Sequence, residues 1–370
     1  MHEVARRGSI GVLVAILLLA EPSVAYAGGG KGKGALNGAE AHGGKKNGKY
    51  HAEVSHVQIT AGGDRGGKTV KLNPKDPDWE APACWYEPKT TPKELKEKIE
   101  SAKPEKRKPE KDEDSGTIFG DLEESNQKAA DAVANQVVGL YENYYQTEKY
   151  DDYNIDKQGK GMFWEGVRNP NKADDPKADA CSEHAIWVPK GKPPKSMPLA
   201  VSPKILAQYA YEELPIPGTE LSLNPENKQT VNLDTWVWLN KGKFKPVDVT
   251  ASLDLLDGTH LSATTTAKPT SLTLEPGTDD AKTYPGSGKC VVKNGQLGEE
   301  YSVGKKDKTP PCGVRYLRAS GQNGSYPLKA TLTWKIAWKG SDGSGGDLPA
   351  GTFSTTKNMT VKEIQSIVRD

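Results

Sequence analysis

Hydrophobic and polar residues alternate along several stretches of the C-terminal half of the chain. Between residues 247 and 255, apolar side chains alternate with Asp, Thr and Ser, and the pattern resumes over 261–267 after Asp257-Gly258. Residues 330–338 repeat it, with two tryptophans on the apolar side. Because successive side chains on a strand point to opposite faces, this period of two predicts strands with one buried face. The Asp-Gly pair predicts a hairpin.

Three stretches between residues 91 and 214 have the spacing of amphipathic helices. The first, 91–102, begins with a Thr-Pro-Lys-Glu capping box that has proline at the first helical position. Residues 122–145 and 202–214 have apolar side chains at spacings of three and four, which predicts one buried helical face in each. Residues 150–179 are mostly polar and predict a loop, interrupted by Met162-Phe163-Trp164.

The C-terminal pattern is typical of an immunoglobulin-like sandwich. Seven or eight short strands with Gly- and Pro-rich turns span about 150 residues, the size expected for such a fold. We expect a mainly β protein with an α+β N-terminal part and a C-terminal antiparallel β-sandwich. The predicted division is a signal peptide 1–27, a Gly/Lys-rich flexible leader 28–49, a small β-hairpin segment 50–88, a charged linker 89–117, a helix-containing region 118–214 and the β-sandwich 215–370.

The first 27 residues have the three parts of a secretory signal peptide. Arg6 and Arg7 precede an apolar run over 12–20, and Ala25-Tyr26-Ala27 supplies a small-residue cleavage site. The run is too short to span a bilayer as a permanent anchor. We expect cleavage after Ala27 and export without a membrane anchor, to a secreted or cell-wall-associated location.

The four cysteines predict disulfides, because they are an even set in an exported chain. Four cysteines allow three pairings. We favour Cys290 with Cys312, since both fall in the C-terminal β region around a polar loop, which leaves Cys84 for Cys181. Zinc is the alternative for Cys181 and His184, but no second pair of matching spacing accompanies them. We therefore expect no metal.

Composition narrows the classes of function. The formal net charge is +1, and this balance argues against nucleic acid as the main partner. The chain has 39 Gly and 26 Pro, which favours loops around modest cores. Eight Trp and fourteen Tyr stand against four Phe, and aromatic rings with a polar edge suit small β cores and wet binding surfaces alike.

A phosphate-loop pattern occurs at Gly62, Gly67, Lys68 and Thr69. In a functional phosphate loop, the backbone cradles phosphates at the start of a helix. The prolines that follow at 74 and 77 exclude that helix, so we interpret the segment as a Gly-rich hairpin tip and expect no cofactor. ATP or GTP binding is the alternative.

Two other groups of residues are candidates for binding or chemistry. Trp236 and Trp238 project from the same face of one predicted strand, where they would either stack sugar rings and partners or form the sandwich core. Glu165 beside Trp164 could serve a glycosidase, which needs two carboxylates at a set separation. With 49 acidic residues, however, a carboxylate beside a tryptophan is expected by chance.

Several segments together resemble a known group of proteins. The segments are 231–239, the pair Cys290 and Cys312, 326–334, 340–346 and 361–365. They resemble exported actinobacterial proteins of unassigned activity that carry a C-terminal PKD-like sandwich and are often automatically labelled ATP/GTP-binding. The resemblance covers roughly residues 198–370. It implies a PKD-like fold and a cell-envelope setting, and it supplies no active-site residues.

Our leading hypothesis is a secreted, non-enzymatic cell-envelope protein whose β-sandwich is an interaction module for a surface protein or wall glycan. The absence of a convincing nucleophile or metal-protease motif favours it over enzymes. The alternatives are a secreted hydrolase acting on envelope glycans or peptides, an ATP/GTP-binding protein using 62–69, and an accessory protein of a surface pilus or secretion apparatus.

Overall fold

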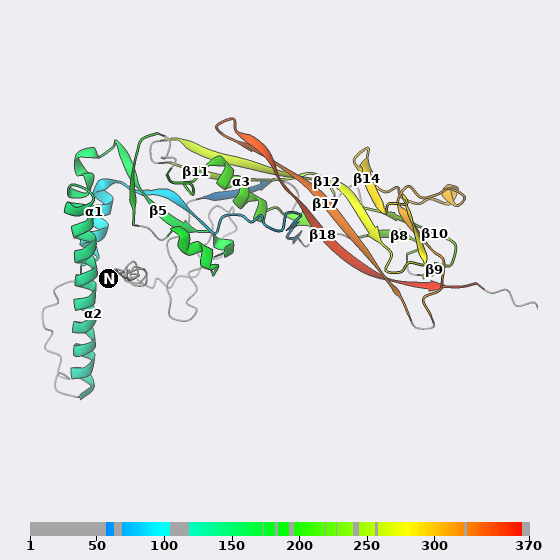
Figure 1. The fold of residues 1–370 in the computed structure, drawn as a ribbon, viewed down its shortest axis with the longest axis horizontal. Helices are drawn as coiled ribbons and strands as arrows, with labels where there is room; N and C mark the ends of the chain where they lie inside the picture. The colour runs from blue at the N-terminus through cyan, green and yellow to red at the C-terminus, as the bar shows by residue number, and fades with distance from the viewer. Residues whose placement is uncertain are drawn as a thin grey trace, which may run out of the picture. The chain divides into compact units, whose positions relative to one another are not determined.

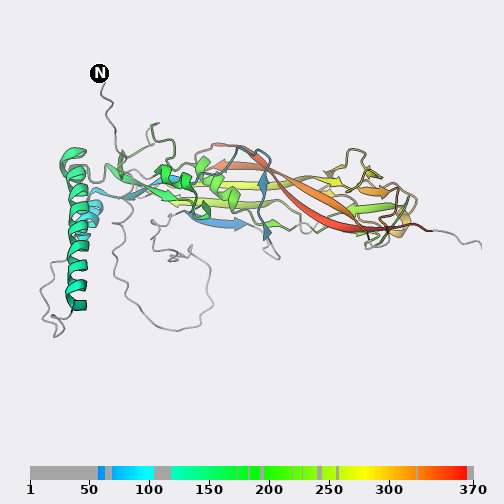
Figure 2. The same cartoon turned by 60° about the horizontal axis from the view of Figure 1, so that its bottom comes forward.

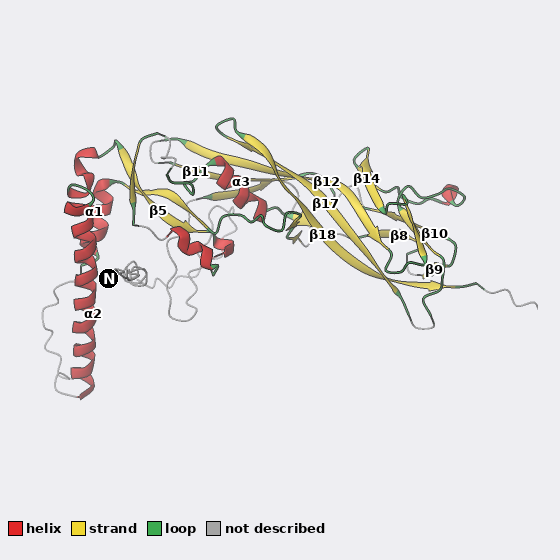
Figure 3. Cartoon of the chain, in the orientation of Figure 1, coloured by secondary structure: helices red, strands yellow, loops and turns green. Residues whose placement is uncertain are grey.

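The computed structural model describes residues 57–62, 69–103, 118–172, 174–181, 184–191, 196–218, 220–226, 228–239, 244–255, 258–321 and 324–364. The predicted signal peptide and leader lie outside these residues. Strands dominate the described part, as Figure 3 shows, and the sheets are antiparallel apart from one short parallel pair. None of the described helices combines the length and apolar character needed to cross a bilayer.

The chain divides into two compact units. The first is built on Ala83–Val201, and the second combines Val57–Pro82, Ser202–Asp254 and Gly258–Asp370. This division differs from the sequence-based one, because the segment before residue 83 and the helix at 203–212 both belong with the C-terminal strands. The physical reason is strand pairing and helix packing between segments far apart in the sequence.

The second unit contains a nine-stranded sheet. Its main path, in spatial order, is β1 (Gln58–Gly62), β11 (Val247–Asp254), β12 (His260–Glu275), β17 (Tyr326–Gly340), β18 (Gly345–Lys362) and β3 (Asn73–Pro74). β14 (Lys289–Lys293) pairs with β12 and β15 (Gln296–Leu297), and β9 (Lys228–Thr230) pairs with β18. The long strands β12, β17 and β18 run side by side in Figures 1 and 2.

The alternating pattern of the sequence is confirmed in these strands. β11 pairs antiparallel with β12, as the predicted hairpin requires, while Asp257 of the predicted turn lies outside the described residues. In β17, every second residue from Leu328 to Trp338 is buried, while Lys329 and Lys335 are exposed. β12 runs through both predicted runs, 261–267 and 270–274, as one strand with a register shift between Pro269 and Ser271.

The same unit contains a four-stranded sheet. It consists, in spatial order, of β13 (Ala281–Tyr284), β16 (Gly313–Tyr316), β10 (Asp234–Trp238) and β8 (Ser222–Asn224). The structure contains the predicted disulfide Cys290–Cys312, with a Cα–Cα distance of 5.5 Å. Because Cys290 lies in β14 and Cys312 directly precedes β16, this bond ties the two sheets together.

The predicted hairpin within 50–88 does not form, and this prediction is wrong. β1 pairs with β11, whereas β2 (Thr69–Val70) pairs with β7 (Ile216–Pro217) and β3 pairs with β18. The strands flanking the Gly-rich segment therefore each use a distant partner rather than one another. The local pattern predicted that they were strands but carried no information on their partners.

Helix α3 (Pro203–Glu212) lies against the nine-stranded sheet, where it contacts β11, β12 and β17. Ser202 caps its first turn by accepting from the Ile205 N–H at 3.3 Å. The buried Thr265 hydroxyl of β12 donates to the Ala207 carbonyl at 2.9 Å. The apolar face predicted for 202–214 is thus buried on the sheet. The boundary between the two units therefore lies after Val201 and not after residue 214.

The first unit has a three-stranded sheet, β4 (Cys84–Thr90), β5 (Gly161–Arg168) and β6 (Ile186–Pro189), with β5 in the centre. Its helices are α1 (Pro92–Ser101), α2 (Ile118–Asn143), the π-helix η2 (Tyr144–Glu148) and the 3₁₀ segments η3 (Asp152–Lys157), η4 (Pro170–Lys172) and η5 (Pro176–Cys181). The capping box at Thr91 and Glu94 is confirmed. The loop predicted over 150–179 is wrong, because it contains the central strand β5.

The disulfide Cys84–Cys181 joins the start of β4 to the end of η5, with a Cα–Cα distance of 6.0 Å. It closes the sheet against the irregular segment that follows β5. Since Cys181 is bonded to Cys84, the zinc alternative for Cys181 and His184 loses its thiolate ligand. Both predicted pairings are therefore present, one in each unit.

Candidate ligand-binding site

An aromatic cluster occupies the end of α2 and the segment that follows it. Tyr145, Tyr153 and Phe163 are buried, and Tyr150 and Trp187 are packed against them half-buried. The Tyr145 and Tyr150 rings stack with centroids 5.7 Å apart, and Phe163 meets the Trp187 ring at 5.3 Å. This packing gives β6 and the π-helix a common rigid support.

Two tyrosine hydroxyls fix the rings at this support. Tyr145 Oη donates to the Ala185 carbonyl at 3.2 Å, and Tyr150 Oη accepts from the Trp187 backbone N–H at 3.2 Å. Burial raises the pKa of Tyr150, and burial is also the main reason that the pKa of Tyr153 is raised to about 12. Both phenols are therefore neutral at physiological pH; Tyr150 accepts a hydrogen bond, whereas Tyr153 serves as a packing group.

Three successive non-glycine residues have left-handed backbone conformations. The φ angles are 37° at Asp152, 56° at Tyr153 and 56° at Asn154. Left-handed residues with a side chain cost about 1–2 kcal/mol each, least for Asn and Asp. The buried Tyr153 ring and the Lys96–Asp152 ion pair at 2.9 Å hold the segment in place. Such strain persists only where the surroundings over-determine it, and it places Asn154 with precision.

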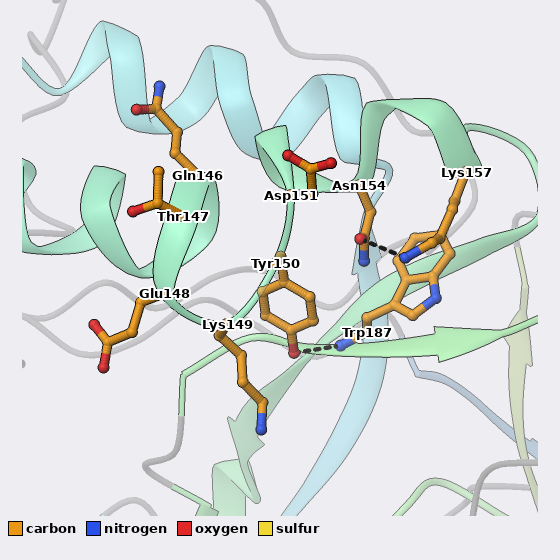
Figure 4. A pocket seen from close by; sticks show the side chains of 9 residues that line it. All are labelled: Gln146, Thr147, Glu148, Lys149, Tyr150, Asp151, Asn154, Lys157 and Trp187. Atoms are coloured by element: carbon orange, nitrogen blue, oxygen red, sulfur yellow. Dashed lines mark hydrogen bonds between the residues drawn. The ribbon is translucent and has the colours of Figure 1, made fainter.

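Asn154 lines an open pocket of about 640 Å³ beside the aromatic cluster. Figure 4 shows the pocket with its side chains, which come from η2, the turn after it, η3 and β6. The lining residues are Gln146, Thr147, Glu148, Lys149, Tyr150, Asp151, Asn154, Lys157 and Trp187. The set contains two lysines and two carboxylates, so its formal charge is zero. The lining therefore consists of two aromatic rings and seven polar or charged side chains.

Four buried side-chain atoms of the described residues have no hydrogen-bond partner, and Asn154 Nδ2 is the one whose residue lines this pocket. The Oδ1 atom of Asn154 accepts from Lys157 Nζ at 2.8 Å, as the dashed line in Figure 4 marks. Because an ammonium group only donates, Oδ1 must face Lys157, and Nδ2 must point away from it. Asn154 is 1% exposed, and Nδ2 has no hydrogen-bond partner among the described residues. An unpaired buried donor costs about 1–3 kcal/mol, which an acceptor on a ligand would recover.

The candidate binding surface at Trp236 and Trp238 is not an open platform, and of the two alternatives the burial of Trp236 favours a place in the core. Trp236 is 4% exposed and Trp238 is half-buried. Thr235 and Val237 are also buried, so both faces of β10 are covered around Trp236. On the Trp236 side, the Tyr301 ring lies 5.7 Å away, and Lys305 Nζ lies 5.6 Å from the indole centroid.

Glu165 is held by neighbours rather than presented to a substrate. Its two carboxylate oxygens contact Lys98 Nζ at 3.3 Å and accept from the Thr90 hydroxyl at 3.4 Å. The residue opposite it in the sheet is Glu87, which is fully buried and accepts from Trp85 Nε1 at 2.7 Å. Neither carboxylate lines the pocket of Figure 4. The hydrolase alternative therefore gains no site from this pair.

The phosphate-loop pattern falls partly outside the described residues, since Gly67 and Lys68 are not among them. Gly62 ends β1, and Thr69 begins β2. The stretch 69–91, which is described without a gap, contains no helix. A phosphate loop needs a helix directly after its Lys-Thr pair, and a strand stands there instead.

Sequence reasoning missed the pocket around Asn154. The five tyrosines of 141–153 were a visible signal, but two of them, Tyr150 and Tyr153, fell in a segment predicted to be a loop. Which Asn would be left-handed and buried depends on packing by α1, which is remote in the sequence. In the described part of the chain, no group of three or more His, Cys, Asp or Glu residues is arranged to hold a metal.

Comparisons with known proteins add no relative. A scan against protein-family models, a search of curated proteins and a search of solved structures each find no match.

Proposed function

We propose that this protein is an exported, non-enzymatic component of the cell envelope that binds a surface partner through the pocket around Asn154. The observation that carries the proposal is the buried, unpaired amide donor of Asn154 at a pocket lined by Tyr150 and Trp187. Two disulfides support maturation outside the reducing cytosol, as does the predicted signal peptide.

We further propose that the second unit is an immunoglobulin-like sandwich of the PKD-like kind. Two antiparallel sheets tied by Cys290–Cys312 support this assignment. Its tryptophans Trp236 and Trp334 are buried, which fits a structural role for the sandwich better than the binding role expected from sequence. We therefore assign the binding role to the pocket in the first unit.

Retention of the purified mature protein on isolated cell wall tests the proposal. We expect wild type to be retained, and we expect Trp187→Ala to weaken retention by about 10-fold, because an aromatic anchor contributes about 1–2 kcal/mol to a site. Trp238→Ala is the matched control, since it removes a half-buried tryptophan of the other unit. Circular dichroism verifies that both variants are folded.

Two outcomes would contradict the proposal. If wild type binds neither wall nor any surface protein, it is not an envelope-binding protein. If Trp238→Ala abolishes retention and Trp187→Ala does not, the β unit is the interaction module and the pocket is not. Turnover of an envelope polymer by wild type would favour the hydrolase alternative.

A further inference from the structure

Asn154 offers a ligand one specific hydrogen-bond donor. The Nδ2 group is directed away from Lys157 by the bond to Oδ1, and the left-handed backbone holds it there. Asn154 is 1% exposed, so little room is left around Nδ2. The ligand atom that pairs with it must therefore be a strong acceptor on a small uncharged group, because a charged group would have to shed its hydration shell. An amide carbonyl is such an acceptor, and it is stronger than a hydroxyl oxygen.

The rest of the lining selects an uncharged, polyhydroxylated ligand. Glu148 and Asp151 accept hydrogen bonds, whereas Lys149 and Lys157 donate them. A hydroxyl group does both at once, so a sugar matches a lining that mixes the two kinds without a net charge. The rings of Tyr150 and Trp187 supply the apolar surface that the C–H face of a pyranose covers.

We infer that the pocket binds a neutral saccharide bearing an acetamido group, with the acetamido carbonyl accepting from Asn154 Nδ2. This inference rests on the proposed function and names the chemical class of its ligand. The methyl of the acetamido group is apolar and would lie against the aromatic lining that Trp187 provides, while ring hydroxyls meet the carboxylates and lysines around the rim (Figure 4).

A matched pair of soluble probes tests the inference. The trimer of N-acetylglucosamine and cellotriose share the same linkage and ring stereochemistry and differ in the acetamido group. We expect the acetamido trimer to bind the full-length mature protein about 10-fold more tightly than cellotriose, measured by titration calorimetry. It should also displace the protein from isolated cell wall, and cellotriose should not.

Variants at Asn154 tie the preference to this donor. Asn154→Asp keeps a residue that tolerates the left-handed backbone and keeps an oxygen for Lys157, but it removes the N–H donor. It should weaken binding of the acetamido trimer by about 10-fold and leave cellotriose binding nearly unchanged. Leu140→Ala, at a position 64% exposed on α2 and outside the lining, is the control and should bind both probes as wild type does.

The outcomes separate this inference from the proposed function. Equal affinity for both probes, or no effect of Asn154→Asp on the acetamido trimer, overturns the inference. If wild type is retained on cell wall but the acetamido trimer neither binds nor competes, the envelope-binding function stands and the ligand class is wrong. If the protein binds neither the cell wall nor either probe, the proposed function and the inferred ligand class are both wrong.

Discussion

At the scale of single residues, buried polar atoms distinguish positions that packing alone would treat as equivalent. Tyr211 and Tyr326 both belong to the β-rich unit, and each places its ring beside another aromatic residue. Tyr326 Oη donates to the Ala319 carbonyl at 3.1 Å, whereas Tyr211 Oη is buried without a partner among the described residues. Asn154 Nδ2 is in the same state as Tyr211 Oη, but it lines a pocket.

Removing the Tyr211 hydroxyl should stabilise the protein. We expect Tyr211→Phe to raise the free energy of unfolding by ~1 kcal/mol, because it deletes an unpaired buried donor. Tyr326→Phe should lower it by a similar amount, because it leaves the Ala319 carbonyl without its donor. Chemical denaturation at neutral pH measures both changes. If both variants change the free energy of unfolding equally and in the same direction, the contrast between a hydrogen-bonded Tyr326 hydroxyl and an unpaired Tyr211 hydroxyl is wrong.

The Tyr211 phenol also predicts a dependence on pH. Burial raises its pKa from 10.0 to about 12. Below pH 10 the phenol is neutral in the folded and unfolded states, so its ionisation does not change the free energy of unfolding. Between about pH 10 and about pH 12 only the unfolded state ionises, so stability falls as pH rises. Tyr211→Phe should therefore lose less stability over this window than wild type, as denaturation at stepped pH would show.

At the scale of elements, the Cys84–Cys181 bond and strand β5 depend on one glycine. A side chain at Gly166 would lie 1.9 Å from the Cys181 carbonyl oxygen, which is backbone and cannot move aside cheaply. The glycine therefore lets η5 pass close over β5, opposite Tyr86 of β4. The π-helix that follows α2 contributes Gln146, Thr147 and Glu148 to the pocket lining.

Two glycine substitutions test this close approach. Gly166→Ala should lower the free energy of unfolding by about 1–3 kcal/mol through overpacking. Gly139→Ala, in α2 with open space around it, should raise it by up to about 1 kcal/mol, since alanine favours the helix. Thermal unfolding of the two variants provides the comparison. A stabilising effect of Gly166→Ala would show that η5 does not lie against β5.

At the scale of the whole molecule, each of the two units contains one disulfide and its own core. Both bonds have the geometry of ordinary cross-links between segments distant in sequence, separated by 97 and 22 residues. In the chain-entropy account, such links stabilise by roughly 3–5 kcal/mol. This contribution is available only in an oxidising compartment.

Export therefore predicts a specific mature protein. We expect mass spectrometry of protein recovered from outside the cell to find Gly28 as the first residue and no free thiol. Alkylation before and after reduction counts the thiols, and the reduced sample is the control. An intact Met1 terminus with four reactive cysteines would contradict export.

The sequence alone determined the features that depend on neighbours in the chain. The period of two in β17, the capping box at Thr91 and the antiparallel pairing of the neighbouring strands β11 and β12 are local, and each formed as expected. Only the tertiary structure decided which strands pair, because β2 and β3 are too short to specify a partner by their own side chains. It also decided the site, because the left-handed segment at Asn154 is held by the burial of the adjacent Tyr153 ring and by the ion pair between Asp152 and Lys96 of α1. Periodicity records which side of a strand or helix is buried, whereas such a placement depends on the whole packed unit.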